Sequence, residues 1–323
     1  MKTMKLLAAT SLLLSVSLSL TADVIRADRS DSQYLALGAQ PQYESVGRLD
    51  ITSRNGRFLG SGTLIASDWV LTAGHCLDKV KSLNFTVGGA TYTADRWVAN
   101  PGWKGNLNSG TDIGLLHLSQ AVENVDPATL YAGSSELGTE GTFVGYGMTG
   151  TGITGATILD YQKRAAQNML DSYLAGRKTV NTNVLLADFD NPKNSKDSKF
   201  GSSVPLDLEG LIAPGDSGGG LFIDVGGVTY LAGVHSFGAA TDGKVDSDYG
   251  DYSGDTRVSA FNAWISSILG PAPISMNGTA LTAGEGNTRA MNVFNAIPEP
   301  ASLTLMALGG ALMLLRRRSK MVA

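Results

Sequence analysis

LTAGHC, at residues 71–76, is the segment from which the fold can be inferred, because it stands first in a series of three. TDIGLL follows at residues 111–116, and GDSGG follows at residues 215–219. The three segments contain, in chain order, a histidine, an aspartate and a serine, at positions 75, 112 and 217. These are residue types that nucleophilic acyl transfer uses, and their order along the chain distinguishes one catalytic architecture from others. The chain therefore carries a candidate catalytic set in the order histidine, aspartate, serine.

Each member of this set has a chemical reason to be present. A serine hydroxyl is a poor nucleophile at neutral pH, so Ser217 needs a base beside it, and histidine titrates close to neutral pH. His75 is the predicted base, and Asp112 is predicted to fix the tautomer of the His75 ring and to stabilise the imidazolium. The glycines around Ser217 let the backbone bend until amide groups converge. We therefore predict an oxyanion hole formed by the amides of Gly215 and Ser217, in which one donor contributes about 3–4 kcal/mol.

Short segments of strand-like composition surround the candidate set. They cover residues 46–51, 58–66, 69–72, 83–87, 91–98, 113–118, 142–146, 219–225 and 228–235. One helix is predicted near residue 265, where Ser259 can cap a segment with apolar residues at helical spacing. Many short strands, 40 glycines and a terminal helix predict an all-β fold of paired antiparallel barrels.

Composition excludes several functions. The chain has 323 residues and 43% hydrophobic residues, enough to bury a substantial core. A net charge of -4 gives no basic surface for a nucleic-acid partner. The aspartates of residues 242–255 lack the order of an EF-hand loop, so we predict a solvated acidic loop there, with calcium binding left open as the alternative. We predict no metal site and no cofactor. Cys76 is the single cysteine, which excludes a disulfide within the chain.

The two ends of the chain predict export. Lysines at positions 2 and 5 precede an apolar stretch at residues 6–20, the pattern of a signal peptide, and we place that segment at residues 1–27. A membrane anchor is the alternative, but the apolar stretch is shorter than the ~20 residues of a spanning helix. A core at residues 35–270 and a linker at residues 271–296, rich in Gly, Asn, Ala and Thr, are then predicted.

The last segment, residues 297–323, has the composition of a sorting tail. It begins with IPEP, continues with an apolar stretch at residues 301–315 and then has three arginines. This order resembles the PEP-CTERM tail of Gram-negative bacteria, which implies an exosortase-type processing enzyme as a partner. An ordinary C-terminal anchor is the alternative. Either way the basic cluster stays on the cytoplasmic side, so the core is predicted in the periplasm, at the cell surface or outside the cell, with transient anchoring in the membrane through the tail.

Residues 45 to 270 resemble the trypsin/chymotrypsin-like serine protease family, on the strength of the three segments quoted above. The resemblance implies two antiparallel six-stranded β-barrels with the active site between them, and a C-terminal helix. It also implies the roles of general base for His75, orienting carboxylate for Asp112 and nucleophile for Ser217. The predicted function is that of a serine endopeptidase, with proteins or peptides as substrates.

The same resemblance assigns roles to part of VHSFG, residues 234–238. Ser236 is expected to hold the catalytic aspartate. Phe237 and Gly238 are expected to pair with the backbone of an extended substrate, an arrangement that favours peptides over small esters.

Two departures from the family pattern leave the activation of the enzyme open. Gly60 stands where the family has the cysteine that pairs with Cys76, so Cys76 is expected to be a free, buried thiol. Family members begin with Ile-Val-Gly-Gly, whose amino group pairs with the aspartate before the catalytic serine. The nearest match here, LALGA at residues 35–39, is poor. Asp216 nevertheless needs a partner, because a buried unpaired carboxylate is costly.

The substrate pocket is also atypical. Leu211 stands six residues before Ser217, where trypsins have an aspartate, so cleavage after Arg or Lys is disfavoured and an apolar residue is expected before the scissile bond. His235 supports an alternative, because some glutamyl endopeptidases have a histidine before the equivalent of Ser236 that meets a substrate carboxylate.

Two other functions remain open at this point. A protease fold can serve as a catalytically idle binding or adhesion module of the envelope or extracellular matrix, because fold alone does not fix function. An esterase that does not cleave peptides is the third possibility.

Overall fold

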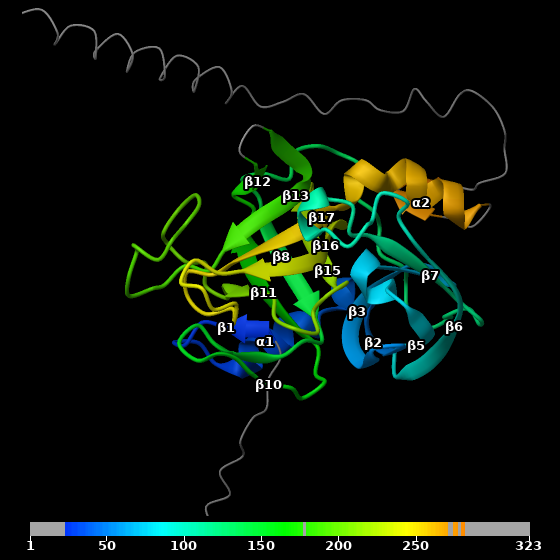
Figure 1. The fold of residues 1–323 in the computed structure, drawn as a ribbon, viewed down its shortest axis with the longest axis horizontal. Coiled ribbons are helices and arrows are strands. Elements are labelled where there is room, and N and C mark those ends of the chain that lie inside the picture. The colour runs from blue at the N-terminus through cyan, green and yellow to red at the C-terminus, as the bar shows by residue number, and fades with distance from the viewer. Residues whose placement is uncertain (1–22, 177–178, 271–273, 277–278, 282–323) are drawn as a thin grey trace, which may run out of the picture.

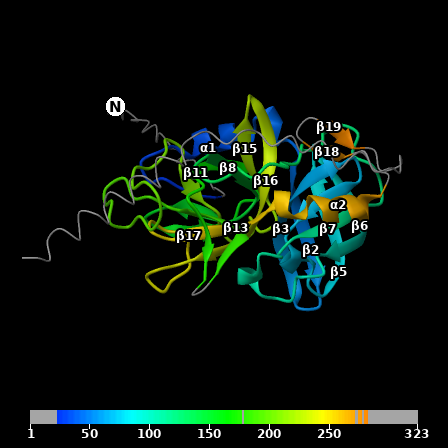
Figure 2. The same ribbon diagram turned by 90° about the horizontal axis from the view of Figure 1, so that it is seen from above.

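A computed structural model of the protein describes residues 23–176, 179–270, 274–276 and 279–281. These residues form two β-rich lobes that lie side by side (Figures 1 and 2). The predicted tail and most of the predicted signal segment lie outside the described residues. Residues 23–27, which the prediction placed at the end of the signal segment, belong to the folded body.

The first lobe is a closed barrel of six strands. The strands are β2 (Val46–Ser53), β3 (Gly56–Ala66), β4 (Trp69–Thr72), β5 (Val80–Val87), β6 (Ala90–Ala99) and β7 (Gly114–Leu118). They pair in the order β2-β3-β4-β7-β6-β5. In β2, Leu49 and Ile51 are buried while Arg48 and Asp50 face outward and form an ion pair, as the two-residue period of a strand requires. The first predicted barrel is therefore confirmed.

The second lobe is a seven-stranded sheet. Its strands are β8 (Glu140–Gly145), β11 (Arg164–Met169), β12 (Ser172–Ala175), β13 (Val180–Asp188), β15 (Gly220–Val225), β16 (Val228–Ala239) and β17 (Tyr252–Arg257). They pair in the order β11-β8-β15-β16-β17-β13-β12, so the predicted second closed six-stranded barrel is wrong. The physical reason is a break at Leu170 and Asp171, which divides one length of chain into β11 and β12 at opposite ends of the sheet. The Asp171 amide donates to the Leu186 carbonyl of β13 (3.0 Å), which brings the two ends together without a continuous ladder.

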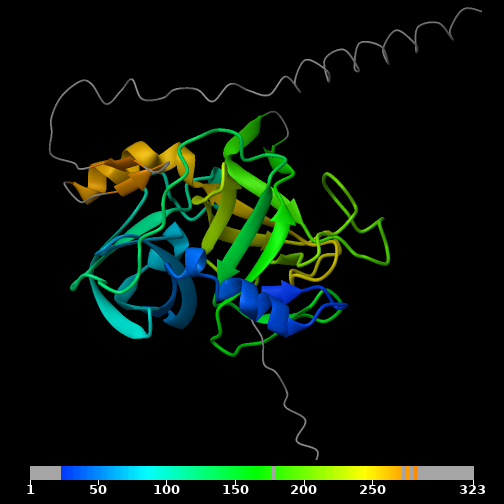
Figure 3. The same cartoon turned by 180° about the vertical axis from the view of Figure 1, so that it is seen from behind.

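Smaller elements cover the second sheet and close the fold. They are β1 (Asp23–Ile25), β9 (Thr149–Thr151), β10 (Gly155–Ile158), β14 (Gly210–Leu211), β18 (Ile274–Met276), β19 (Thr279–Leu281), α1 (Asp31–Gly38) and α2 (Asn262–Leu269). A four-stranded sheet has the order β10-β9-β1-β14. Seen from behind, α1 and β1 lie against the second lobe, and α1 contacts β11 (Figure 3). β18 pairs with β19 inside the predicted linker, so that segment contains some regular structure.

The terminal helix is confirmed, with a later start than predicted. α2 begins at Asn262, and Ile265 and Leu269 pack into the core that also contains residues of the first barrel. Ser259 does not cap α2, because it lies in a short 3-10 helix at residues 258–261 and its hydroxyl donates to Glu136 (2.8 Å).

A buried arginine ties the N-terminal helix to the second sheet. The side chain of Arg164 in β11 is fully buried and pairs with Asp31 at the start of α1 (2.7 and 3.0 Å) and with Asp160 (3.2 Å). Such a pair is costly to break, because removing one partner leaves charge buried without compensation.

We expect Arg164→Met to lower the free energy of unfolding by about 3–5 kcal/mol, because Asp31 and Asp160 lose their countercharge. Urea unfolding measures the change. The matched control is Arg29→Met, which removes an exposed pair with Asp207 (2.8 Å) and is expected to cost about 1 kcal/mol or less. Equal small losses in the two variants would contradict a structural role for the buried pair.

Candidate active site

The candidate histidine lies just after β4, the third strand of the first barrel. After β4 the chain forms a short 3-10 helix, Gly74–Leu77, which contains His75. Gly74 is tightly enclosed, because a Cβ there would lie 3.0 Å from Trp103 and 3.2 Å from Asp112 Oδ1, so a side chain would force these neighbours to shift. This close approach lets the imidazole sit directly beside the aspartate.

His75 and Asp112 form a doubly bonded pair. The Asp112 side chain is fully buried; its Oδ2 lies 2.8 Å from His75 Nδ1, and its Oδ1 accepts the His75 backbone amide at 2.8 Å. Ser236 Oγ donates to the same Oδ2 at 2.6 Å. Three donors therefore hold the carboxylate, and the bond to Nδ1 leaves the Nε2 of His75 as the atom free to accept a proton.

The surroundings of His75 favour the protonated ring. Burial acts to lower the pKa of His75, but the neighbouring sulfur of Cys76 and the hydrogen-bonded Asp112 carboxylate outweigh burial and raise the pKa above its usual value. An imidazolium formed during a reaction would be stabilised by the same contacts.

Ser217 lies on a loop that both lobes hold. The Ser61 amide of β3 donates to the Ser217 carbonyl (2.8 Å), and Ser61 Oγ donates to the Gly215 carbonyl (3.0 Å). From the second lobe, the Gly218 amide donates to the His235 carbonyl (2.8 Å). Gly218 has φ +86°, and a Cβ there would lie 2.0 Å from Thr72 Oγ1, so only glycine fits.

Two amides of this loop remain available for an oxyanion. The amides of Asp216, Gly218 and Gly219 are used by carbonyls of the protein. Within the described residues, no hydrogen bond uses the amides of Gly215 or Ser217, and both residues line the larger cavity. This is the arrangement that an oxyanion hole requires.

Two cavities meet at His75 and Ser217. The larger has about 540 Å³ and the smaller about 430 Å³, and both side chains line both cavities. Within the described residues, no hydrogen bond joins the Ser217 hydroxyl to the His75 ring, a separation that unliganded active sites often show. The histidine, aspartate and serine predicted from sequence are thus brought together around one shared space.

The smaller cavity is the candidate substrate pocket. Its apolar wall comes from Ile212, Ala213, Pro214, Phe237, Gly238, Leu107 and Val245. Trp103 also lines it, and its indole donates to Asp78 (3.1 Å). Sequence reasoning missed Trp103 and Ser61, because neither stands in a recognisable motif.

Two residues predicted at the pocket lie elsewhere. Leu211 is fully buried in a small cluster with Val24 and Phe189, and Ile212 takes the place at the cavity instead. His235 is also fully buried: Nδ1 pairs with Asp255 (2.5 Å), and Nε2 accepts the Val144 amide (3.3 Å). Both predictions are corrected: His235 and Ser236 are neighbours on β16 and point to opposite sides, and Leu211 ends β14 inside the core while Ile212 follows that strand.

The structure also shows where the residues of the other two departures from the family pattern lie, namely the unpaired cysteine and the altered N-terminal segment. Cys76 is a free, buried cysteine, as predicted, and a Cβ at Gly60 would lie 3.4 Å from its sulfur. LALGA at residues 35–39, the poor match to the start of family members, lies in and just after α1. Strand β1 lies beside Asp216 instead, which sequence reasoning missed because it assigned residues 23–25 to the signal segment.

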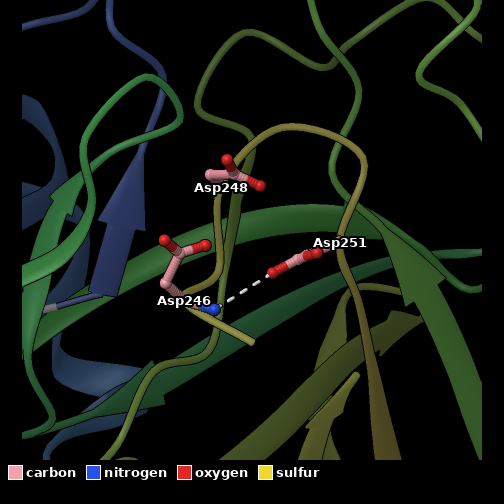
Figure 4. A group of neighbouring side chains, drawn as sticks. All are labelled: Asp246, Asp248 and Asp251. Carbon is pink, nitrogen blue, oxygen red and sulfur yellow. Dashed lines mark hydrogen bonds between the residues drawn. The ribbon is translucent and has the colours of Figure 1, made fainter. Parts of the chain in front are cut away.

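The acidic loop at residues 242–255 borders the pocket. Carboxylate oxygens of Asp246, Asp248 and Asp251 lie within 4.8 Å of one another (Figure 4). Asp251 accepts the amide of Asp246 (3.3 Å), and Lys244 pairs with the Asp246 side chain. Burial raises the pKa of Asp251 to about 6. The loop thus supplies its own donors to the cluster, and its clearest effect is to place Val245 at the wall of the pocket.

The comparisons with known proteins agree with this geometry. The family model described as trypsin matches residues 38–203. Chymotrypsin-like elastase family member 1 from Canis lupus familiaris is 29% identical over 226 residues, covering 64% of this chain and 80% of the relative. Rattus norvegicus vitamin K-dependent protein C is 26% identical, covering 68% of this chain and 48% of the relative.

Solved structures show the same fold. The structure titled HL collagenase aligns with a TM-score of 0.54 and 20% identity, over 72% of this chain and 96% of that chain. Neuropsin, from mouse brain, aligns with a TM-score of 0.53 and 17% identity, over 72% and 98%. The fold and the family match together place this chain in the trypsin family of serine proteases.

A second match concerns the tail. The PEP-CTERM protein-sorting motif covers residues 296–318, which indicates an exported protein sorted to the cell surface and implies processing by an exosortase. Among the residues that the structure describes, no helix combines the length and apolar character needed to cross a bilayer.

Proposed function

We propose that this protein is a cell-surface serine endopeptidase that hydrolyses peptide bonds through an acyl-enzyme on Ser217. The observation that carries the proposal is the His75–Asp112 pair facing Ser217 across the shared cavities. The trypsin match spans residues 38–203 and ends before Ser217, so the assignment of the nucleophile rests on the loop geometry.

The geometry supports a two-stage reaction. His75 Nε2 takes the proton of the Ser217 hydroxyl as the oxygen attacks the scissile carbonyl, and Asp112 stabilises the imidazolium. The amides of Gly215 and Ser217 bind the oxyanion. The imidazolium then gives its proton to the leaving amine, and water hydrolyses the ester by the same steps.

Strand β16 offers an edge for the substrate backbone. β15 pairs with β16 only as far as Val234, so on that side residues 236–238 have no partner strand among the described residues. On the other side, Phe237 and Gly238 pair with β17. An extended peptide can therefore add as a strand beside Ser236–Gly238, which favours peptides over small esters.

The test is labelling by a fluorophosphonate probe, which reacts only with an activated serine. We expect labelling of the processed protein and turnover of peptide substrates. Correctly folded protein that takes no label would instead be an idle binding module, and ester turnover without peptide cleavage would indicate an esterase.

The pocket predicts cleavage after apolar residues. Ile212, Ala213 and Val245 offer no countercharge to a buried substrate side chain, and Asp78 is already bonded to Trp103. We expect peptides with Leu, Met or Val before the scissile bond to have kcat/KM at least about 10-fold above those with Arg, Lys or Glu, because burying an unpaired charge costs several kcal/mol. A peptide library measures the preference, with Ser217→Ala protein as the control for contaminating proteases. Preferred cleavage after a charged residue would contradict the assignment of the pocket.

A further inference from the structure

Asp216 anchors the loop that presents the nucleophile. Its side chain is fully buried, and its two oxygens each accept one backbone amide: Oδ1 from Gly147 (2.6 Å) and Oδ2 from Ala213 (2.8 Å). Because Asp216 lies between Gly215 and Ser217, its position sets the direction of the two amides assigned to the oxyanion hole. Whatever holds Asp216 therefore acts on the catalytic loop.

Strand β1 borders both donors of Asp216. It pairs in antiparallel fashion with β14, which ends two residues before Ala213, and in parallel fashion with β9, which begins two residues after Gly147. Thr149 Oγ1 donates to the carbonyl of Asp23, which fixes the start of β1. The strand thus forms a brace across the two segments that support the catalytic loop.

The side chain of Asp23 meets the carboxyl group of Asp216. Asp23 is 1% exposed, neither of its oxygens has a hydrogen-bond partner among the described residues, and its carboxyl group lies beside that of Asp216. Two carboxylates repel each other and cannot hydrogen-bond, so the contact requires a proton on one of them. Asp216 already accepts two amides, which favours its charged form, so the proton belongs on Asp23.

The charged groups around the pair have other partners. Arg164 of β11 interacts with Asp23 at longer range, but its guanidinium is bonded to Asp31 and Asp160. His235 of β16 interacts with Asp216, but its ring is bonded to Asp255. Among the described residues, no charged group is therefore left to join the two carboxyl groups, and a shared proton can do so.

We propose that Asp23 is a positioning residue of the catalytic loop, whose protonated carboxyl donates to Asp216 and so couples strand β1 to the amides of Gly215 and Ser217. The predicted effect of Asp23 on catalysis rests on the proposed function. The carboxyl pair itself belongs to the folded structure and does not depend on that function. It differs from what the family resemblance implies, because a carboxyl group takes the place of an amino group beside the aspartate.

The pair makes the stability of the protein depend on pH. Burial, reinforced by the charge of Asp216, raises the pKa of Asp23 well above its usual value. Since the folded-state pKa is above the unfolded value, the contribution to stability is complete at low pH and is lost as the pH rises through the folded-state pKa. Loss of the proton puts a second negative charge beside Asp216, so stability and kcat are expected to fall together.

The test compares Asp23→Asn with Asp23→Ala in the processed protein. Asparagine keeps a hydrogen-bond donor without a titrating group, whereas alanine removes the donor. We expect Asp23→Ala to lower kcat on the order of 10–100-fold with KM changed less than about threefold, as for weakened oxyanion binding. Asp23→Asn is expected to recover most of that loss and to abolish the fall in kcat and in the urea midpoint that the parent shows as the pH rises through the pKa of Asp23. Asp207→Asn, an exposed carboxylate 71% accessible, is the matched control and should behave as the parent.

Three outcomes would overturn the proposal. They are an Asp23→Ala variant with the kcat and pH profile of the parent, an Asp23→Asn variant as impaired as Asp23→Ala, and loss of kcat on acetylation of the terminal amine, which would make that amine the partner of Asp216. If the parent takes no fluorophosphonate label, the proposed function fails, but the urea midpoints of the two variants against pH still decide whether the proton is shared.

Discussion

Replacing Ser217 with alanine is expected to reduce kcat on the order of 10⁶-fold and to abolish fluorophosphonate labelling. The hydroxyl is the atom that forms the acyl-enzyme, and Ser217 lines both cavities together with His75, whereas the Ser236 hydroxyl already donates to Asp112. Residual turnover would come from the amides of Gly215 and Ser217 and from substrate binding. The rate on a peptide with an apolar residue before the scissile bond measures the effect.

The matched control for this variant is Ser67→Ala. Ser67 is exposed and lies in the turn between β3 and β4, away from the two cavities. It should keep the activity of the parent, and both variants should unfold within about 0.5 kcal/mol of the parent, as surface substitutions usually do. A Ser217→Ala protein that still cleaves the peptide at more than about one hundredth of the parent rate would rule out Ser217 as the nucleophile.

Replacing Asp112 with asparagine is expected to reduce kcat about 10⁴-fold, the second largest effect. The asparagine amide can donate to His75 Nδ1, which would leave Nε2 protonated and unable to accept the proton of Ser217. It would also remove the charge that stabilises the imidazolium. The rate at the pH optimum and the fluorophosphonate labelling rate should fall together.

The Ser236→Ala variant tests how much the orientation of Asp112 contributes to catalysis, because it keeps the charge of Asp112. Ser236 donates one of the three hydrogen bonds of Asp112, so its loss should leave the His75 contact in place. We expect a loss of about 10–100-fold, corresponding to one hydrogen bond to a charged group. If Asp112→Asn were no worse than Ser236→Ala, Asp112 would not be the orienting carboxylate.

The first barrel could be predicted because its strands have recognisable sequence patterns. Apolar residues alternate with polar ones in β2, and turns such as residues 53–56 separate the strands. β11, with the sequence RAAQNM, and β14, only two residues long, carry no such pattern and gain their structure from tertiary contacts. The break between β11 and β12 was therefore not visible in the sequence.

The catalytic set was predictable for a different reason from the pocket. His75, Asp112 and Ser217 stand in segments that the chemistry constrains residue by residue. Pocket residues are selected only by the side of the strand they face, and a shift of one position reverses that side. Ile212 rather than Leu211 therefore faces the cavity. His235 was misplaced in the same way, since Ser236 beside it faces the site.

Asp23 escaped sequence reasoning because its partner is remote. A lone aspartate after an apolar leader has the appearance of a cleavage boundary, and only the three-dimensional pairing of β1 with β9 and β14 brings it to Asp216. Contacts of this kind depend on topology, which no local pattern encodes.

The central claim is that His75, Asp112 and Ser217 act as one unit, and a crystal structure with a peptide boronate tests it most directly. We predict a tetrahedral boron bonded to Ser217 Oγ, one boronate oxygen within hydrogen-bond distance of the amides of Gly215 and Ser217, and His75 Nε2 facing the adduct. A fully occupied inhibitor that leaves Ser217 unmodified, or a His75 ring turned away from the adduct, would contradict the account.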